Sequence, residues 1–162
     1  MTVGAHPDIR RTLLFLLTDE QILLAMKKRG FGVGKWNGVG GKIEAGESIE
    51  EALVRECQEE IGVTPVSWQK VAELDFVQDS DANPWHMYVH AYISKVWQGD
   101  PAESEEMKPQ WYSQSTIPYE KMWEDDVYWL PKVLAGGKVS GKFTFDANDC
   151  LKRHEVSPAG WV

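Results

Sequence analysis

The chain has 162 residues, of which 43% are hydrophobic and 26% are charged, a composition that fits one compact domain. The sequence contains 17 Lys and Arg residues and 25 Asp and Glu residues. The resulting formal net charge of -8 argues against unaided attraction to a nucleic acid polymer. No run reaches the roughly 18 apolar residues of a membrane span, and residues 1–11 hold no signal-like apolar stretch, so we expect a cytoplasmic protein.

The first apolar segments of the chain predict two strands. Residues 11–17 read Arg-Thr-Leu-Leu-Phe-Leu-Leu, which favours a buried strand, and residues 22–26 read Ile-Leu-Leu-Ala-Met. The polar residues Thr18, Asp19 and Glu20 lie between them. Because a short polar segment between two apolar runs favours a turn, we expect a hairpin here.

The charge of the chain changes sharply at residue 43. Residues 27–42 carry five basic residues, no acid and six glycines, whereas residues 43–60 carry seven acids and one base. Apolar residues recur every fourth position over 49–61, which predicts an amphipathic helix. Ser48 and Glu51 form a capping box and Gly62 is a left-handed stop, so we expect the helix to be bounded by these residues.

The rest of the chain predicts further strands and a second helix. Residues 70–76 and 87–96 are expected to be half-buried strands, the second with apolar residues at a spacing of two. Residues 126–134 predict a helix. Turn-forming residues between 142–146 and 150–155 predict a closing hairpin.

Three glutamates on the first predicted helix are candidates for chemistry. Glu56, Glu59 and Glu60 are spaced to crowd one flank. A solvated acidic face, with Arg55 pairing Glu59, is the simpler interpretation of the charges alone. Beside a basic glycine loop, however, three oxygen donors favour Mg²⁺ or Mn²⁺, which are hard cations that bridge to phosphates. We therefore expect a metal-bound phosphate site.

The glycine loop at residues 38–41 lies just before this helix. Without side chains, Gly40 and Gly41 are expected to let backbone groups approach a phosphate or the metal, although a glycine cluster alone more often marks a turn. Its spacing to the carboxylates is more informative. Gly41 is followed after five residues by Glu47, and after seven more by Arg-Glu-Cys-Gln-Glu-Glu-Ile-Gly-Val at residues 55–63. This pattern over residues 41–63 resembles the Nudix box at each of its fixed positions.

The resemblance to the Nudix family implies an α/β/α sandwich with a mixed β-sheet between helices, formed by residues 1–162 as a single Nudix hydrolase domain. It also implies hydrolysis of a nucleoside diphosphate linked to another group. By this resemblance Glu56, Glu59 and Glu60 hold divalent ions, and Arg55 orients a carboxylate by a salt bridge. The chemistry agrees, because divalent ions neutralise phosphate charge and lower the pKa of bound water.

Segments around the box resemble one branch of the family, the oxidised purine nucleoside triphosphatases, also called MutT-type or 8-oxo-dGTP diphosphatases. These segments are residues 26–32, 35–38, 103–107 and 122–129. The resemblance also marks pocket-lining, phosphate and loop-acid positions, which are Phe31, Phe76, Met87, Lys27 and Glu106. Glu106 would serve as an additional metal ligand or base, and Gly40 would lie at the metal. Core packing and solvated surface charge are the competing interpretations of these residues.

Base recognition is the other role that this resemblance assigns. Asn37, Asp125 and Asp126 would hydrogen-bond the purine edge, while Trp123 would stack on its face. The residue types suit the ligand, because a purine has a flat apolar face and an edge of donors and acceptors. Helix capping explains the two aspartates equally well from sequence alone.

The sequence therefore predicts Mg²⁺-dependent hydrolysis of oxidised purine nucleoside triphosphates, with Mn²⁺ as a substitute, to the monophosphate and pyrophosphate in nucleotide-pool sanitation. We expect a monomer that binds the nucleotide and neither a nucleic acid polymer nor a membrane. One alternative is a Nudix hydrolase of ADP-ribose, a dinucleoside polyphosphate or a canonical triphosphate. Another is a catalytically silent nucleotide-binding adaptor, although no box glutamate is missing.

Overall fold

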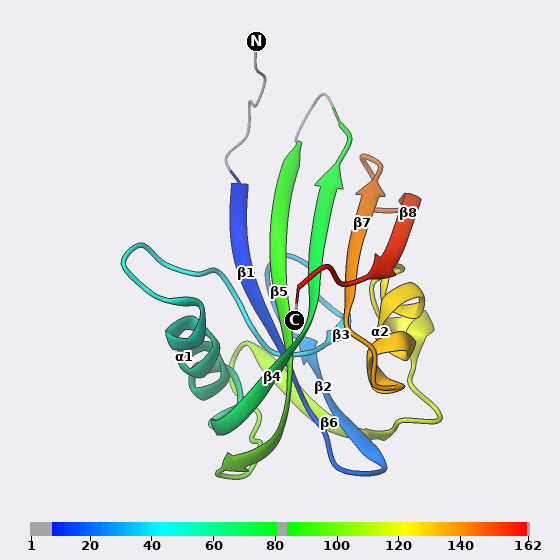
Figure 1. Cartoon of the computed structure of the whole chain (residues 1–162). Helices are drawn as coiled ribbons and strands as arrows, with labels where there is room; N and C mark the ends of the chain where they lie inside the picture. Colours follow the sequence, from blue (N-terminus) through cyan, green and yellow to red (C-terminus); the bar gives the residue numbers. More distant parts are fainter. Residues whose placement is uncertain (1–7, 81–83, 162) are drawn as a thin grey trace.

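The computed structural model describes residues 8–80 and 84–161, which form two sheets and two α-helices (Figure 1). The helices are α1 (Ile49–Ile61) and α2 (Asp126–Leu134), the second preceded by the short 3₁₀ helix η1 (Tyr119–Lys121). The larger sheet is mixed and has the order β1 (Asp8–Leu16), β5 (Trp85–Gln98), β4 (Thr64–Gln78), β7 (Val139–Phe145) and β8 (Leu151–Pro158). The smaller sheet is antiparallel and has the order β3 (Trp36–Asn37), β2 (Gln21–Lys27) and β6 (Met107–Ser113).

The hairpin expected at residues 11–26 is wrong, because β1 and β2 belong to different sheets. β1 pairs in parallel with β5, whereas β2 pairs with β3 and β6, and the two strands share only the bridge Leu17–Ile22. The physical reason is that both strands are apolar on both faces. A two-stranded hairpin cannot cover two apolar faces, and strands of this kind belong in the interior of layered structures.

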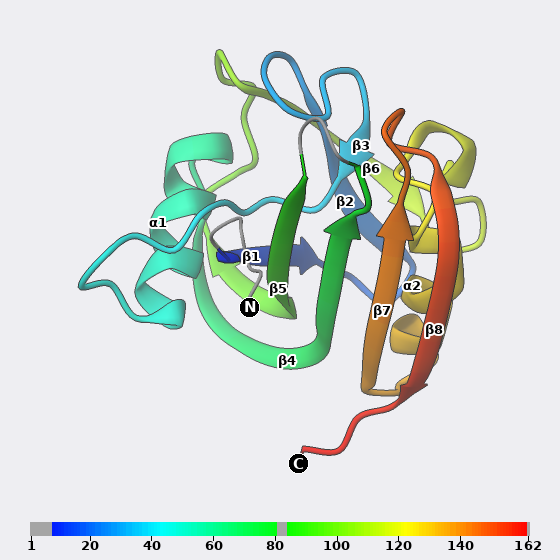
Figure 2. The same ribbon diagram turned by 90° about the horizontal axis from the view of Figure 1, so that it is seen from above.

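Alternation along β1 divides the core into two clusters. Phe15 packs in the cluster that contains Trp129 of α2, whereas Leu14 and Leu16 pack in the cluster that contains Leu53 of α1. Figure 2 shows the two helices on opposite sides of the molecule. The predicted α/β/α sandwich is confirmed, with the difference that its strands form two sheets instead of the single sheet expected.

The remaining predicted elements are confirmed. The helix predicted at 49–61 has these bounds in the structure, and Ser48 and Glu51 form both hydrogen bonds of the capping box. The segments 70–76 and 87–96 lie inside β4 and β5, and β7 pairs with β8 as a closing hairpin. No helix within the described residues is long and apolar enough to cross a membrane.

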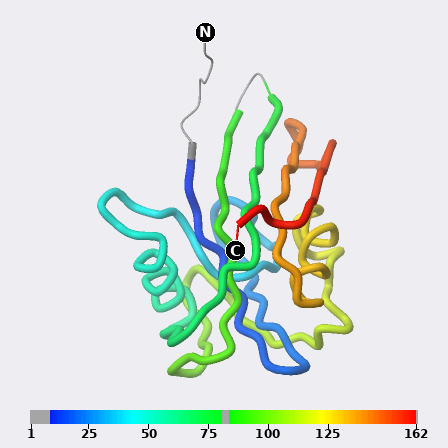
Figure 3. The backbone as a smooth tube through the Cα atoms, in the orientation of Figure 1, coloured from blue at the N-terminus to red at the C-terminus, as the bar shows by residue number. Residues whose placement is uncertain are grey.

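The segment between β3 and α1 runs along the outer edge of β1 and reaches α1 at the side of the molecule (Figure 3). Val39 exchanges backbone hydrogen bonds with Leu14 at 2.6 and 2.9 Å, and the amide of Thr12 donates to the carbonyl of Gly41 at 2.9 Å. The amide of Ile43 donates to Arg10 at 2.9 Å. This pairing places the glycine loop between the larger sheet and the acidic flank of α1.

Candidate active site

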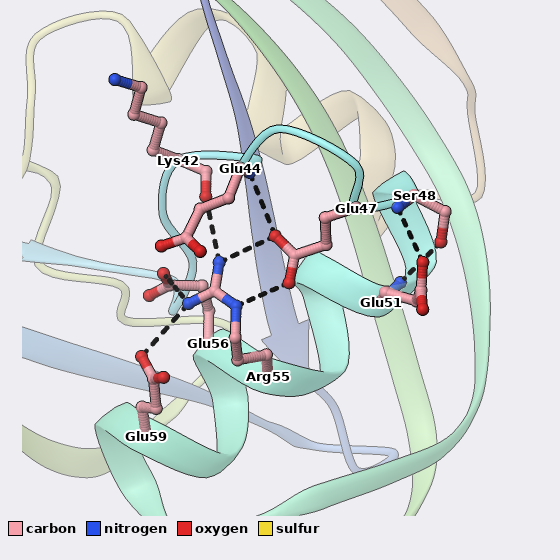
Figure 4. Close-up of polar contacts among 8 residues, drawn as sticks. All are labelled: Lys42, Glu44, Glu47, Ser48, Glu51, Arg55, Glu56 and Glu59. Atoms are coloured by element: carbon pink, nitrogen blue, oxygen red, sulfur yellow. Dashed lines mark hydrogen bonds and ion pairs between the residues drawn. The ribbon is translucent and has the colours of Figure 1, made fainter.

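Arg55 is the centre of a polar network that joins the loop to α1 (Figure 4). Its Nε and Nη2 donate to the two carboxylate oxygens of Glu47 at 2.6 and 3.0 Å, and Nη2 also donates to the carbonyl of Lys42 at 3.1 Å. Its Nη1 donates to Glu56 at 2.8 Å and to Glu59 at 3.2 Å. Such a two-pronged arginine–carboxylate pair fixes orientation as well as charge. The network therefore holds both the loop and the Glu56 carboxylate in place.

The glycines of the loop allow the backbone to lie against two carboxylates. A Cβ atom on Gly41 would lie 2.5 Å from Cδ of Glu56, and a Cβ atom on Gly40 would lie 1.9 Å from the carbonyl oxygen of Thr12. The Gly40 amide donates to Oε1 of Glu60 at 2.9 Å. Any side chain at either glycine would displace the loop or the carboxylate beside it.

The three box glutamates have different surroundings. Glu60 is 3% exposed, and burial raises its pKa to about 7. Burial also raises the pKa of the less buried Glu56, while hydrogen bonding and charge attraction from Arg55 oppose the rise. The side chain of Glu59 is 60% exposed and pairs with Arg55. Glu56 and Glu59 thus share the guanidinium of Arg55, whereas Glu60 accepts from the Gly40 amide.

A hard divalent cation fits the donors at this position. The carboxylate of Glu60 lies at the Gly40 amide and that of Glu56 lies against Gly41, and a cation there would favour the ionised forms that burial disfavours. In the part of the chain that the structure describes, no three His, Cys, Asp or Glu side chains converge closely enough to form a complete metal site.

The loop before β6 brings one further acid toward Glu60. Glu103 pairs with Lys28 at 2.6 Å, and Glu105 is almost fully exposed. Glu106 is half-exposed, and its charge is among those that raise the pKa of Glu60. Of these three acids, only Glu106 contributes to the raised pKa of Glu60.

A pocket of about 130 Å³ extends from the glycine loop to the start of α2. All of the predicted substrate-binding residues except Gly41 line this pocket. They are Lys27, Phe31, Asn37, Gly40, Phe76, Met87, Trp123, Asp125 and Asp126. Gly41 lies against Glu56 instead. The structure thus brings together residues that are up to 99 positions apart in the chain, from Lys27 to Asp126.

Two buried aspartates form the polar end of this pocket. Asp125 and Asp126 are 3% and 2% exposed. The indole Nε1 of Trp129 donates to Oδ2 of Asp125 at 2.9 Å, whereas Oδ2 of Asp126 is buried without a hydrogen-bond partner. Burial raises the pKa of both side chains, and repulsion from Asp125 adds to the rise at Asp126. The Asp125 side chain makes no capping hydrogen bond, so helix capping does not account for it.

Aromatic rings form the apolar walls of the pocket. Phe31 stacks on Trp123 with ring centroids 5.2 Å apart, and Trp85 meets the edge of Phe31 at 5.7 Å. The ammonium group of Lys35 lies 5.1 Å from the centre of a Trp123 ring. The side-chain oxygen of Asn37 accepts a hydrogen bond from the Gly38 amide at 2.8 Å, which fixes the amide and leaves its NH₂ group to donate.

Several lining residues were not predicted as pocket residues from the sequence. Arg11, Lys35, Trp85 and Phe145 line the pocket. The alternation along β1 could have predicted that Arg11 faces the pocket, because Arg11 shares a strand face with the buried residues Leu13 and Phe15. The sequence around Trp85 and Phe145 does not indicate a pocket position, because pairing between distant strands brings these residues to the site.

The chain matches the NUDIX domain model over residues 8–133. It belongs to the Nudix family. It is 40% identical over 147 residues to an oxidized purine nucleoside triphosphate hydrolase of Danio rerio, and 42% identical over 145 residues to the protein of the same name in Mus musculus. Each alignment covers 90% of this chain and 92% of the relative.

The fold resembles the crystal structure of a MutT protein from Bacillus halodurans, with a TM-score of 0.80 and 24% sequence identity. The superposition covers 93% of this chain and 99% of the other. The protein is a Nudix hydrolase, an enzyme family that generally uses divalent metal ions.

Proposed function

We propose that this Nudix hydrolase converts oxidised purine nucleoside triphosphates, such as 8-oxo-dGTP and 2-hydroxy-dATP, to the monophosphate and pyrophosphate. The observation that carries the proposal is the unpartnered Oδ2 atom of Asp126, buried in a pocket that is also lined by Gly40, whose amide donates to Glu60. A buried polar atom without a partner is costly, and the edge of a purine supplies the missing hydrogen bond. The printed names of the relatives from Danio rerio and Mus musculus support the same class of substrate.

The aspartate pair accounts for binding of more than one oxidised purine. Two adjacent buried carboxyl groups disfavour a double negative charge, so the pair retains a proton. It then presents both a donor and an acceptor to the base edge, beside the NH₂ group of Asn37. Trp123 offers a ring for stacking that accepts any purine face.

Mg²⁺, with Mn²⁺ as a substitute, is the metal that we propose for the acidic flank. Glu56, Glu59 and Glu60 would hold it together with the Gly40 backbone, and Glu106 would add a further carboxylate or act as a base. When bound, the ion neutralises phosphate charge and lowers the pKa of a coordinated water. The protein side chains position these groups: Arg55 fixes the Glu56 carboxylate and the loop, and Lys27 lines the pocket beside the phosphate path.

We also propose the domain organisation, oligomeric state and cellular location of the enzyme. Residues 1–162 would act as one domain, as a monomer in the cytoplasm that sanitises the nucleotide pool. The formal charge of -8 disfavours a nucleic acid polymer as the substrate, and no described helix is suited to cross a membrane.

A nucleotide panel tests the proposal, with pyrophosphate and inorganic phosphate assayed separately. We expect the highest kcat/KM for an oxidised purine triphosphate, with release of pyrophosphate. A higher value for ADP-ribose, a dinucleoside polyphosphate or a canonical triphosphate would assign the protein to another Nudix activity. Saturable binding without any phosphate product in Mg²⁺ or Mn²⁺ would indicate a silent adaptor.

The Glu56→Gln variant tests the role of the acidic flank. It removes a proposed metal ligand without touching the base pocket, so turnover should fall by at least about 100-fold while binding of the nucleoside monophosphate persists. Glu50→Gln is the matched control, because Glu50 is an exposed acid in the first turn of the same helix. Equal turnover in the two variants would contradict the role given to Glu56.

A further inference from the structure

Arg11 is a cation that the site described above does not use. It lies on β1 and lines the pocket, on the same strand face as Leu13 and Phe15. Its guanidinium makes neither a hydrogen bond nor an ion pair with any residue in 8–80 or 84–161. A partly buried charge without such contacts is unfavourable unless a partner is supplied from elsewhere.

The surrounding charges locate Arg11 relative to the box. Burial lowers its pKa, and attraction by Glu56 and Glu60 opposes the decrease. Both glutamates are therefore near enough to act on the guanidinium, yet neither forms an ion pair with it. Arg55 differs, because Glu47, Glu56 and the Lys42 carbonyl occupy its donors. Arg11 keeps its donors available to a ligand.

The backbone places Arg11 between the two parts of the site. Arg11 bridges to Lys42, and the next residue along β1, Thr12, hydrogen-bonds Gly41 in the loop that contacts the glutamates. Arg11 also lines the pocket that contains Asp126. In a nucleoside triphosphate, the sugar and the α-phosphate lie between the base and the two terminal phosphates. With the base at the aspartates, the α-phosphate passes Arg11.

We propose that the guanidinium of Arg11 binds the α-phosphate, the group that stays on the nucleoside monophosphate after hydrolysis. The inference rests on the function proposed above, because that function places the base. A planar guanidinium can donate two parallel hydrogen bonds to phosphate oxygens, which suits a fixed position on a strand. Arg11 then contributes to affinity for substrate and product alike, and it distinguishes a nucleotide from a nucleoside.

Binding without divalent metal tests this assignment directly. Calorimetry would compare 8-oxo-deoxyguanosine with its 5′-monophosphate on the wild type, Arg11→Gln and Arg11→Lys. We expect Arg11→Gln to lower monophosphate affinity about 10- to 100-fold, the usual range for losing a charge-assisted contact, with nucleoside affinity within about 2-fold of wild type. Arg11→Lys keeps the positive charge but cannot donate two parallel hydrogen bonds, so its loss of monophosphate affinity should be intermediate.

The neighbouring arginine supplies a matched control. Arg10 lies on the same strand, is exposed, and lines a hollow on the other face of the sheet with Tyr88 and His90. Arg10→Gln should leave both affinities unchanged. An equal loss in Arg10→Gln and Arg11→Gln would mean that only net charge matters, and would overturn the assignment.

Two other results would overturn the assignment in different ways. If Arg11→Gln keeps the wild-type preference for monophosphate and changes only the Mg²⁺ concentration needed for turnover, Arg11 is a counterion of Glu56 and Glu60. If the wild type binds 8-oxo-deoxyguanosine no better than thymidine, the base pocket itself is wrongly assigned and the proposed function fails with it. Nucleoside affinity thus separates failure of the pocket from failure of the phosphate contact.

Discussion

Asp125 and Asp126 are adjacent in the chain, buried and close to one another, and the indole of Trp129 supplies a hydrogen bond to only one of them. Replacing either by Asn changes the donors and acceptors offered to the base but leaves the box untouched. In a dry pocket, an unpaired polar group on the purine costs about 1–3 kcal/mol. We therefore expect Asp125→Asn and Asp126→Asn to change the ratio of kcat/KM among 8-oxo-dGTP, 2-hydroxy-dATP and dGTP.

Steady-state kinetics at several Mg²⁺ concentrations would measure that ratio and the metal requirement together. The ratio should change more than the Mg²⁺ requirement. Trp123→Ala is the comparison variant, since loss of a stacking surface should weaken all purines to a similar degree. The base-reading role would be wrong if both Asn variants kept the wild-type ratio.

The same aspartates predict how stability depends on pH. Because burial raises their pKa values, the folded state binds their protons more tightly than the unfolded state does. This contribution to stability is fully present below the ordinary Asp pKa of about 3.9 and is lost as the pH rises through the raised values. Asp126→Asn removes one such group. The free energy of unfolding of this variant, relative to that of the wild type, should therefore increase as the pH rises from 4 to 8, by at most about 1.4 kcal/mol per pH unit.

Urea unfolding of both proteins across this pH range would give the difference. Asp19→Asn is the control, because Asp19 lies in the exposed turn between β1 and β2. It gives the effect of the same substitution at an exposed position, with which the Asp126→Asn difference is compared at each pH. A difference for Asp126→Asn that does not change with pH would show that this carboxyl group titrates alike in both states.

At the scale of elements, the loop and α1 form one unit held by close contact. A methyl group on Gly41 would meet the Glu56 carboxylate at 2.5 Å, so Gly41→Ala must move the carboxylate or the loop. We expect Gly41→Ala to lower kcat at least about 10-fold while nucleoside binding changes little, because displaced catalytic groups lose far more rate than affinity. Gly160→Ala is the control, since nothing lies within 4 Å of its added Cβ. Equal kcat in both variants would contradict the close approach.

The elements also show which features a sequence can predict. The bounds of α1 were predicted correctly because Ser48, Glu51 and Gly62 act on their own neighbours through caps. The hairpin at residues 11–26 was predicted wrongly because strand partners are chosen by burial of both faces, which depends on distant segments. The box spacing located Glu56 and Glu60, but the pairing of Arg55 with Glu47 across the loop came from the fold.

At the scale of the whole molecule, the pocket joins residues of the larger sheet, the smaller sheet and α2. Its lining comes from every strand except β8 and from the start of α2, with Arg11 on β1, Phe76 on β4 and Phe145 on β7. A bound nucleotide therefore contacts both sheets at once. Because a ligand of the folded state stabilises it by mass action, 8-oxo-dGMP at 100 times its Kd should add about 2.7 kcal/mol. For a chain of this size the melting temperature should rise by roughly 5–10 °C.

Thermal unfolding with and without the nucleotide would measure this shift, and hydrogen exchange would show where it acts. Protection should increase together in β1, β4 and β7, which the pocket links, and change least in β8, which contributes no lining residue. Thymidine monophosphate at the same concentration is the control ligand, because one pyrimidine ring fills less of the space between Trp123 and the aspartates. An equal shift with thymidine monophosphate would mean that the pocket does not select purines. Protection confined to one strand would mean that the ligand binds outside the pocket, because residues of all three strands line the pocket.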